Sequence, residues 1–165
     1  MRNGSAARRV LSLICVVVLS GCAASGFHRR GELWRHKGAE FEVPDLTREG
    51  WRRFRLGGAD LAFQKNGEGV IAVRVSCNHS PRPLQWAGRD LWLGIPREGL
   101  TVREREVGGR PAVETTGQAE GTAVRAVTVE NEQCVMDVAH ARLEDEADTG
   151  VFDRFLDGLR FGEGR

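Results

Sequence analysis

Beyond its first 21 residues, the sequence has no apolar run of 18 residues, no internal repeat and no low-complexity stretch. A helix needs about 20 apolar residues to cross a bilayer, so the later part of the chain is not expected to span a membrane. The absence of repeats argues against a solenoid, and the length suits one domain with its own hydrophobic core.

The chain also lacks a strong excess of either charge, with 24 basic and 23 acidic residues. Three of the basic residues and none of the acids fall in the first 21 positions, which leaves the remainder at −2. Proteins that bind nucleic acids need a basic surface for the phosphates, so no nucleic-acid partner is expected. The local exception is the stretch 23–38, which contains four basic residues and one acidic residue.

Motifs for catalysis and metal binding are missing as well. The sequence has no tyrosine, no Gly-x-Ser-x-Gly, no Cys-x-x-Cys, and no His-x-x-x-His among its four histidines, His28, His36, His79 and His140. A structural zinc site therefore has little support. Gly67-Glu68-Gly69 precedes alternating apolar residues instead of a helix, so these glycines indicate a turn and not a nucleotide site. We predict no catalytic residue, no cofactor and no metal.

What the sequence does contain is a short export signal. Three arginines and no acid precede an apolar stretch of 11 residues, Val10 to Ser20, which is about 16 Å of helix and roughly half of a hydrocarbon core. The stretch ends in Leu19-Ser20-Gly21-Cys22. These first 22 residues resemble the lipobox signal peptide of bacterial lipoproteins. The resemblance implies that residues 1–21 are removed and that fatty acyl chains such as palmitate are attached at Cys22.

The lipoprotein resemblance also implies a location. The chain would be anchored by lipid to an envelope membrane and face the periplasm, and Ala23 after the acylated cysteine favours the outer membrane. Ala7 to Leu11 partly resembles a twin-arginine export signal, so the export route stays open. We expect residues 22–38 to form a lipidated basic tether, which either lies along anionic headgroups or acts as a solvated linker. Trp34 belongs either at the headgroups or in the domain.

Two cysteines remain for pairing once Cys15 is removed with the signal and Cys22 is acylated. Cys77 and Cys134 both lie at the ends of predicted strands, and disulfides form in oxidising compartments outside the cytosol. We therefore predict a Cys77–Cys134 disulfide. The alternative is two buried thiols that act as small apolar side chains.

The remaining pattern is one of short strands with two helices. Ile71, Val73, Val75 and Cys77 alternate on one strand face, and Asn66-Gly67, Gly108-Gly109 and Asn131-Glu132 are typical of hairpin turns. A helical stripe recurs at Leu84, Ala87, Leu91 and Ile95, and a second at Phe152, Phe155, Leu156 and Leu159. Asp148 or Thr149 is the expected N-cap of the last helix.

These elements predict one α+β domain over residues 39–165. It would contain a mostly antiparallel, twisted sheet of seven or eight strands, with one helix in the middle and another at the C-terminus. The order of elements resembles the PsbP/Mog1-like fold over about residues 39–161. That resemblance implies a fold and no particular function, since unrelated binding proteins share it.

The middle helix carries a second apolar face. Trp86 and Leu93 lie about 20° apart on it, opposite Leu84 and Leu91, and this face is either covered by another element or open to a partner. We expect a lipid-anchored, non-catalytic binding or accessory domain, such as a component of an envelope transport or assembly machine. The alternatives are an anchored hydrolase with a site that only the fold assembles, and a carrier of lipids or other hydrophobic ligands. The sequence does not determine the oligomeric state.

Overall fold

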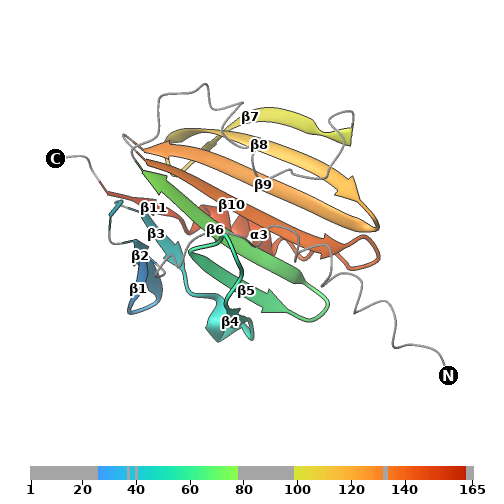
Figure 1. Ribbon diagram of the computed structural model, residues 1–165, viewed down its shortest axis with the longest axis horizontal. Coiled ribbons are helices and arrows are strands. Elements are labelled where there is room, and N and C mark those ends of the chain that lie inside the picture. Colours follow the sequence, from blue (N-terminus) through green and yellow to red (C-terminus); the bar gives the residue numbers. More distant parts are fainter. Residues whose placement is uncertain (1–25, 37, 40, 78–98, 132–133, 163–165) are drawn as a thin grey trace.

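The computed structural model describes residues 26–36, 38–39, 41–77, 99–131 and 134–162. In this part of the chain, two antiparallel sheets and one α-helix form the domain (Figure 1). None of the described helices is long and apolar enough to cross a membrane.

The larger sheet has seven strands in the order β4-β5-β6-β10-β9-β8-β7, and every neighbouring pair is antiparallel. Its strands are β4 (Arg52–Phe54), β5 (Leu61–Lys65), β6 (Gly69–Cys77), β7 (Thr101–Val107), β8 (Arg110–Ala119), β9 (Thr122–Asn131) and β10 (Cys134–Leu143). Four consecutive strands, β7 to β10, form a meander, and β10 then pairs with β6. The sheet therefore begins at the short β4 and ends at the longer β7.

The smaller sheet has four strands in the order β1-β2-β3-β11. These are β1 (Phe27–Arg30), β2 (Leu33–His36), β3 (Phe41–Pro44) and β11 (Arg160–Phe161), and the 3-10 helix η2 (Leu46–Glu49) follows β3. The C-terminal strand β11 joins the N-terminal strands through pairing of Phe161 with Phe41. The sheet thus brings together the two ends of the domain.

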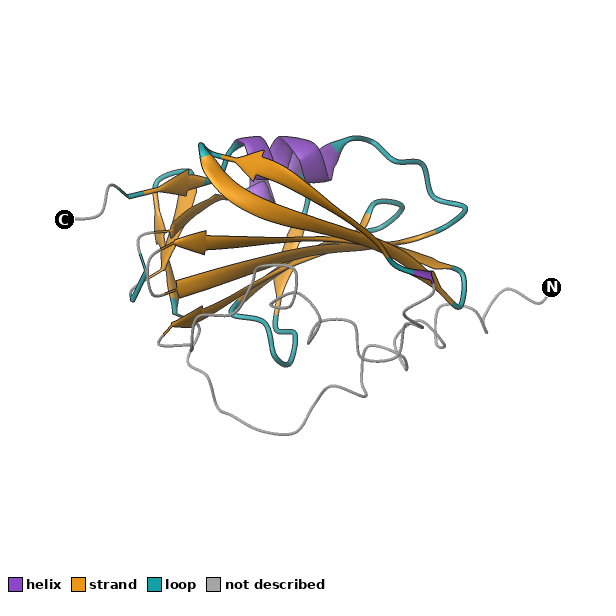
Figure 2. Ribbon diagram, turned by 90° about the horizontal axis from the view of Figure 1, so that it is seen from above, coloured by secondary structure: helices purple, strands orange, loops and turns teal. Residues whose placement is uncertain are grey.

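The helix α3 (Val151–Asp157) covers one face of the larger sheet (Figure 2). Phe152, Phe155 and Leu156 point into the core, as their spacing predicted. The N-cap is Gly150, with no capping bond from a side chain, so the prediction of Asp148 or Thr149 was wrong by one or two residues. The Asp148 carboxylate instead accepts a hydrogen bond from the Gly150 N–H, which fixes the turn that enters the helix.

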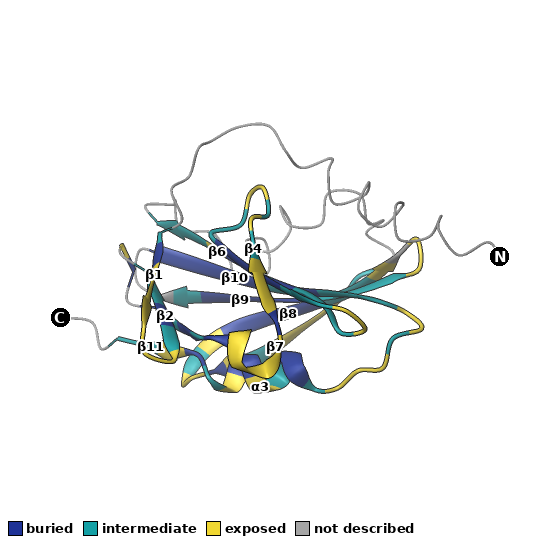
Figure 3. Ribbon diagram, turned by 90° about the horizontal axis from the view of Figure 1, so that it is seen from below, coloured by how far each residue is buried: buried dark blue, intermediate teal, exposed yellow. Residues whose placement is uncertain are grey.

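The core lies between the helix-facing side of the larger sheet and α3 with the smaller sheet. Strand alternation selects its residues: Ile71 and Val73 of β6 are fully buried on the predicted face, next to Met136 and Val138 of β10. Buried positions follow β10 for most of its length, whereas β1 is exposed after its first residue (Figure 3). The central strands thus anchor the fold, and the outer strands provide its surface.

The observed architecture is mostly antiparallel β, with one α-helix among the described residues. The predicted sheet and C-terminal helix are present, but the strands divide into two sheets instead of one. The predicted middle helix falls within residues 78–98, outside the described residues. The hairpin turns at Asn66-Gly67 and Gly108-Gly109 occur as predicted, and Glu120-Gly121 forms a further one between β8 and β9.

The start of the domain differs from the boundary predicted at Ala39. Residues 27–36, predicted as part of a tether, form the β1–β2 hairpin, and its side chains Phe27 and Trp34 are buried in the core. Arg53 of β4 lies over the Trp34 ring at 4.4 Å, which fixes the hairpin beside the β4 edge of the larger sheet. Of the two positions considered for Trp34, the structure shows packing on the domain.

Candidate functional site

The predicted site residues fall partly outside the described part of the chain. Cys22, Trp86 and Leu93 all lie outside it, so the acylation site and the apolar patch on the middle helix remain predictions. The described residues do place Cys77, Cys134 and His140. They also reveal a cluster of charged side chains that the sequence analysis missed.

Cys77 and Cys134 form a disulfide, with their sulfur atoms 2.09 Å apart. The two residues face each other in the antiparallel register of β6 and β10. Both sulfurs lie 3.9 Å from the Gly38 carbonyl oxygen, so the bond sits where the larger sheet meets the segment between β2 and β3. A cysteine in a disulfide has no thiolate to offer, so Cys77 is no nucleophile in this form.

His140 is buried and does not resemble a catalytic base. Its Nε2 lies 2.8 Å from the Glu68 carbonyl oxygen, and because a carbonyl only accepts, Nε2 carries the proton. The ring stacks on Phe152 with centroids 5.5 Å apart. Burial lowers the pKa of His140, and Arg142 and Arg125 act in the same direction, against the hydrogen bond that the ring donates to the Glu68 carbonyl and the charge of Asp148. The neutral ring therefore works as a packing group between β10 and α3.

The cluster joins three strands and the helix through five charged side chains. Arg103 and Arg105 alternate on β7, Glu114 is central on β8, Arg125 lies on β9, and Asp153 is in the first turn of α3. Register places Arg103 directly opposite Glu114. All four strand residues point to the helix-facing side because they occupy alternate positions.

Glu114 is the centre of the cluster, with no exposed side-chain surface. Arg103 Nη2 lies 3.0 Å from both carboxylate oxygens, Arg105 Nη1 donates to Oε2 at 2.6 Å, and Arg125 Nε donates to Oε1 at 3.1 Å. Arg125 also binds Asp153 with two parallel hydrogen bonds of 2.9 and 3.0 Å. A buried carboxylate is tolerated only with such partners, and Glu114 has three.

The electrostatics keep every member of the cluster charged. Burial alone would raise the pKa of Glu114, but Arg105, Arg103 and Arg125 together hold that pKa below its ordinary value. Arg125 likewise lowers the pKa of Asp153, and Asp153 raises the pKa of Arg125. Neither carboxyl group can give up a proton near neutral pH, because neither holds one. The cluster therefore supplies no general acid at that pH.

The arrangement does leave positive charge at the surface. Three arginines face two carboxylates, so the cluster carries a net charge of +1. The Arg103 side chain is 64% exposed, and only its Nη2 donates within the cluster. A carboxylate or phosphate group would be a matching partner for the exposed part of this guanidinium.

The sequence contains a pattern that indicates this cluster. Glu114 interrupts an otherwise apolar and threonine-rich strand at an inward position, and Arg103 and Arg105 share one face of the preceding strand. A charge at a core position requires partners. Which charges supply them depends on the pairing of β7, β8 and β9, and that pairing is a tertiary property.

No group of three or more histidine, cysteine or acidic side chains comes close enough to hold a metal ion within the residues that the structure describes. Directly after β3 of the smaller sheet lies another buried carboxylate, Asp45, which is 3.0 Å from Arg29 and accepts from the Thr47 N–H. Burial opposes ionisation there, but the contacts with Thr47, Trp34 and Arg29 lower the pKa of Asp45. This acid caps η2 and has a structural role.

Comparisons with known proteins support the fold alone. No protein-family model matches the chain, and no curated protein matches it in sequence. Among solved structures, the chain is similar to the cyanobacterial PsbP protein, CyanoP, of Synechocystis sp. PCC 6803, with a TM-score of 0.55 and 14% identity over 89% of this chain and 99% of that one. This likeness supports a PsbP-like fold.

A second solved structure is less similar. It is PA94 from Pseudomonas aeruginosa, a protein of unknown function, with a TM-score of 0.47 and 14% identity over 84% of this chain and 97% of that one.

Proposed function

We propose that this protein is a lipid-anchored, non-catalytic binding module on the periplasmic side of an envelope membrane, accessory to a transport or assembly machine. The observation that supports the anchor is Leu19-Ser20-Gly21-Cys22 after a basic start and 11 apolar residues. Each buried acyl CH₂ contributes about 0.8 kcal/mol, so two or three chains at Cys22 would hold the domain at the bilayer. The disulfide in the domain is compatible with an oxidising compartment.

The binding surface in this proposal is the β7 edge of the larger sheet. Among the described strands, β7 has β8 as its one neighbour, and its residues Thr101 to Glu104 are exposed. An edge strand offers unpaired backbone groups that can accept another strand. Val102, 52% exposed, gives this edge an apolar contact on the face away from α3.

The charge pattern of β7 indicates the kind of partner. On the helix-facing side, Arg103 and Arg105 belong to a cluster with a surplus positive charge, and on the other side Glu104 and Glu106 are exposed. A partner strand with acidic side chains opposite the arginines therefore pairs favourably. The partner we propose for this edge is an extended segment of another protein with alternating acidic residues.

A second copy of this chain fits the edge poorly. If two β7 strands paired around a two-fold axis, the residue at the axis would lie opposite its own copy. In the three central registers this residue is Arg103, Glu104 or Arg105. Each register therefore places like charges directly opposite each other, which is destabilising. The pattern thus disfavours self-association through β7 and selects a complementary strand.

The anchor is tested by the mass of the protein made in a Gram-negative host. We expect the mature chain to begin at Cys22, to carry acyl mass on that residue and to remain with the membranes. The matched control is Cys22→Ser, which we expect to lose the acyl mass and the membrane association while keeping the same fold. A wild-type protein without acyl mass would contradict the anchor.

The binding surface is tested with two synthetic ten-residue peptides, one alternating Thr and Glu and one alternating Thr and Ser, followed by amide chemical shifts of the labelled domain. We expect the Glu peptide to shift amides of β7 and β8, and the uncharged Ser peptide to shift them much less at the same concentration. Arg103→Gln, which removes the charge without placing a second acid against Glu114, should weaken Glu-peptide binding at least threefold. The same charge change at Arg55, an exposed residue after β4, is the control and should preserve it. Equal shifts with both peptides would refute the preference for an acidic strand, and unchanged β7 amides with both would refute the edge as the site.

A further inference from the structure

We propose that the outer face of the β1-β2-β3-β11 sheet rests on an anionic lipid surface and so fixes the orientation of the anchored domain. This inference rests on the acylation of Cys22 proposed above. The sheet would make a second contact with the membrane, which is electrostatic and involves residues of the folded domain. The β1–β2 hairpin would thereby orient the domain, which a flexible tether cannot do.

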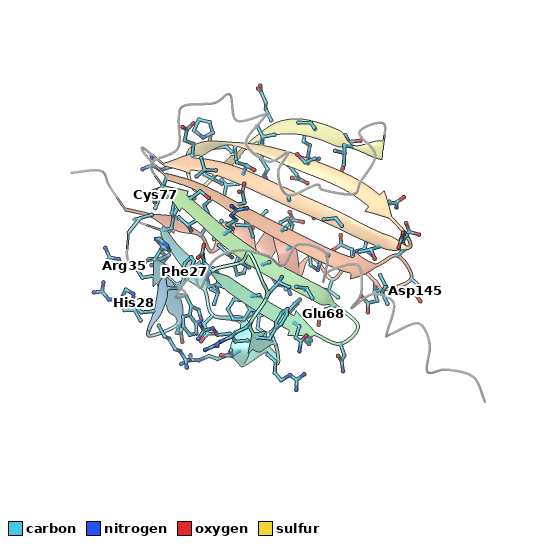
Figure 4. All side chains as sticks on the ribbon, in the orientation of Figure 1. Phe27, His28, Arg35, Glu68, Cys77 and Asp145 are labelled. Atoms are coloured by element: carbon cyan, nitrogen blue, oxygen red, sulfur yellow. A yellow bond between two sulfur atoms is a disulfide. The ribbon has the colours of Figure 1, made fainter. Side chains whose placement is uncertain are left out.

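The two faces of the smaller sheet differ sharply. The inner face holds Phe27, Trp34, Phe41 and Val43, all buried. Strand alternation places the side chains between these buried ones on the outer face. There, His28 lies opposite Arg35, Arg30 lies opposite Leu33, and Glu42 lies between Arg35 and Arg160. In Figure 4, His28 and Arg35 project away from the body of the domain while Phe27 turns inward.

The outer face carries surplus positive charge. Its arginines are Arg30, Arg35 and Arg160, and its one acid among the described residues is Glu42, whose Oε1 lies 4.0 Å from Arg35 Nε. The net charge is therefore +2 without His28. Arg30 and Arg160 are exposed and present that charge to solvent.

Chain length brings this face to the membrane. Phe27, the first residue of β1, is five residues after Cys22, and even a fully extended chain spans at most about 18 Å over that distance. Attraction to anionic headgroups acts within a Debye length of about 8 Å at physiological ionic strength. The five-residue link keeps the hairpin near the membrane, so its arginines reach this range more readily than they would on a long linker.

The opposite end of the domain carries the opposite charge. The turn between β10 and α3 holds the exposed acids Glu144, Asp145 and Asp148. Figure 4 places Asp145 at the far end of the domain from His28 and Arg35. An anionic surface attracts the basic end and repels the acidic end, so both favour one orientation. In that orientation the smaller sheet lies at the membrane, while the β7 edge remains away from the β4 side where the hairpin packs.

The test is amide hydrogen exchange of the acylated full-length mature protein on two kinds of vesicle, phosphatidylethanolamine with one quarter phosphatidylglycerol, and phosphatidylcholine alone. We expect amides of β1 and β2 to exchange at least threefold more slowly on the anionic vesicles than on the neutral ones. The difference should disappear in 0.5 M NaCl, because salt screens the attraction. Equal exchange on both vesicles would overturn the proposal.

Charge-reversal variants distinguish the effect of the arginines on the outer face from the effect of the protein's net charge. R30E/R35E should lose the protection on anionic vesicles, and R30K/R35K should keep it. Adding E144R/D145R to R30E/R35E restores the wild-type net charge but reverses its distribution, and we expect it to leave β1 and β2 unprotected. Protection regained in that variant would show that net charge alone matters and would refute the face. Circular dichroism of each variant confirms that it is folded before its exchange is compared.

The two proposals fail in different ways. Absence of acyl mass on Cys22 contradicts the anchor itself. Acylated protein that binds both vesicles with the same exchange in β1 and β2 retains the anchor and contradicts only the orientation.

Discussion

Glu114 shows how one residue organises a whole end of this domain. A carboxylate with no exposed surface would be strongly destabilising alone, and the three arginines around it turn it into a link between β7, β8, β9 and α3. The arrangement is costly to disturb, because removal of an arginine leaves the fully buried Glu114 carboxylate less well compensated. The cluster also favours one pairing of the strands, because only the observed register of β7, β8 and β9 brings these groups together.

We predict that Glu114→Gln lowers the free energy of unfolding by about 3 kcal/mol at pH 7, since an uncharged amide cannot balance three guanidinium groups. The folded-state pKa of Glu114 is lowered, so its contribution is present above the unfolded-state pKa and is lost as pH falls below about 4.5. The variant should therefore lose less stability than the wild type between pH 7 and pH 3. Urea denaturation at both pH values measures this.

The control for that prediction is Glu104→Gln, an exposed acid on the other face of the same region. It should change stability by less than about 0.5 kcal/mol at either pH. An equal effect of the two substitutions would mean that the arginine cluster contributes nothing specific.

Gly69 is a second residue whose chemistry is set by its surroundings. It begins β6 with a φ of +93°, and a Cβ there would lie 2.2 Å from the Ala141 carbonyl oxygen of β10. Gly67, in the same turn, has a φ of +76° and open space around it. The two glycines share the backbone requirement, but only Gly69 is in close contact with another strand.

We predict that Gly69→Ala costs about 2 to 4 kcal/mol, because it combines an unfavourable φ with a clash against backbone that cannot move without breaking β6–β10 pairing. Gly67→Ala should cost about 1 kcal/mol, from the backbone conformation alone. Thermal or urea unfolding of the two variants gives the comparison. Equal costs would show that the contact with Ala141 relaxes freely.

At the scale of elements, the disulfide joins β6 and β10, the two strands that connect the β4–β6 part of the larger sheet to the β7–β10 meander. Their pairing links residues 57 apart in sequence. A covalent bond at this point restricts the unfolded chain and secures the register at the end where Cys134 and Cys77 meet. The bond thus secures the larger sheet where two parts distant in the sequence meet.

We predict that reduction of this disulfide lowers the free energy of unfolding by up to about 4 kcal/mol, the loop-entropy value for a separation of this size. The measurement is the urea midpoint with and without reductant. In C77A/C134A, the midpoint should already be low and should not respond to reductant. A reductant effect of the same size in that variant would assign the loss to something other than this bond.

At the scale of the whole molecule, the domain combines a core that extends to its N-terminal hairpin with an uneven distribution of surface charge. Phe27 and Trp34 contribute to the same core as α3 and the central strands. The hairpin is therefore part of the folding unit, and the proposed acyl anchor is attached almost directly to a rigid body. That geometry is what allows surface charge to orient the domain.

We predict that Trp34→Ala destabilises the mature protein by about 3 to 5 kcal/mol, the usual cost of removing a buried aromatic ring. His28→Ala, on the outer face of the same hairpin, should leave stability within about 0.5 kcal/mol. A chain that starts at Ala39 should be less stable still than Trp34→Ala, because it lacks Phe27 and two strands as well. Unchanged stability on removal of residues 26–38 would show that the hairpin is dispensable.

The sequence by itself determined the local features of this protein. The alternation in β6, the apolar stripe of α3 and the turns at Asn66-Gly67 and Gly108-Gly109 depend on residues close together in the chain, so the pattern was sufficient to predict them. The Cys77–Cys134 pairing was predicted because two cysteines at strand ends leave one possible bond. The acylation of Cys22 is a prediction from the same kind of local pattern.

Only the tertiary structure decided which strands are neighbours, and therefore which side chains meet. The division into two sheets, the incorporation of the β1–β2 hairpin and the cluster around Glu114 all depend on contacts between distant residues. The basic hairpin was interpreted as a tether because its charges suit solvent, and its burial of Phe27 and Trp34 became visible only in the folded core. Local pattern specifies an element, whereas packing and long-range pairing specify the surface that the elements build together.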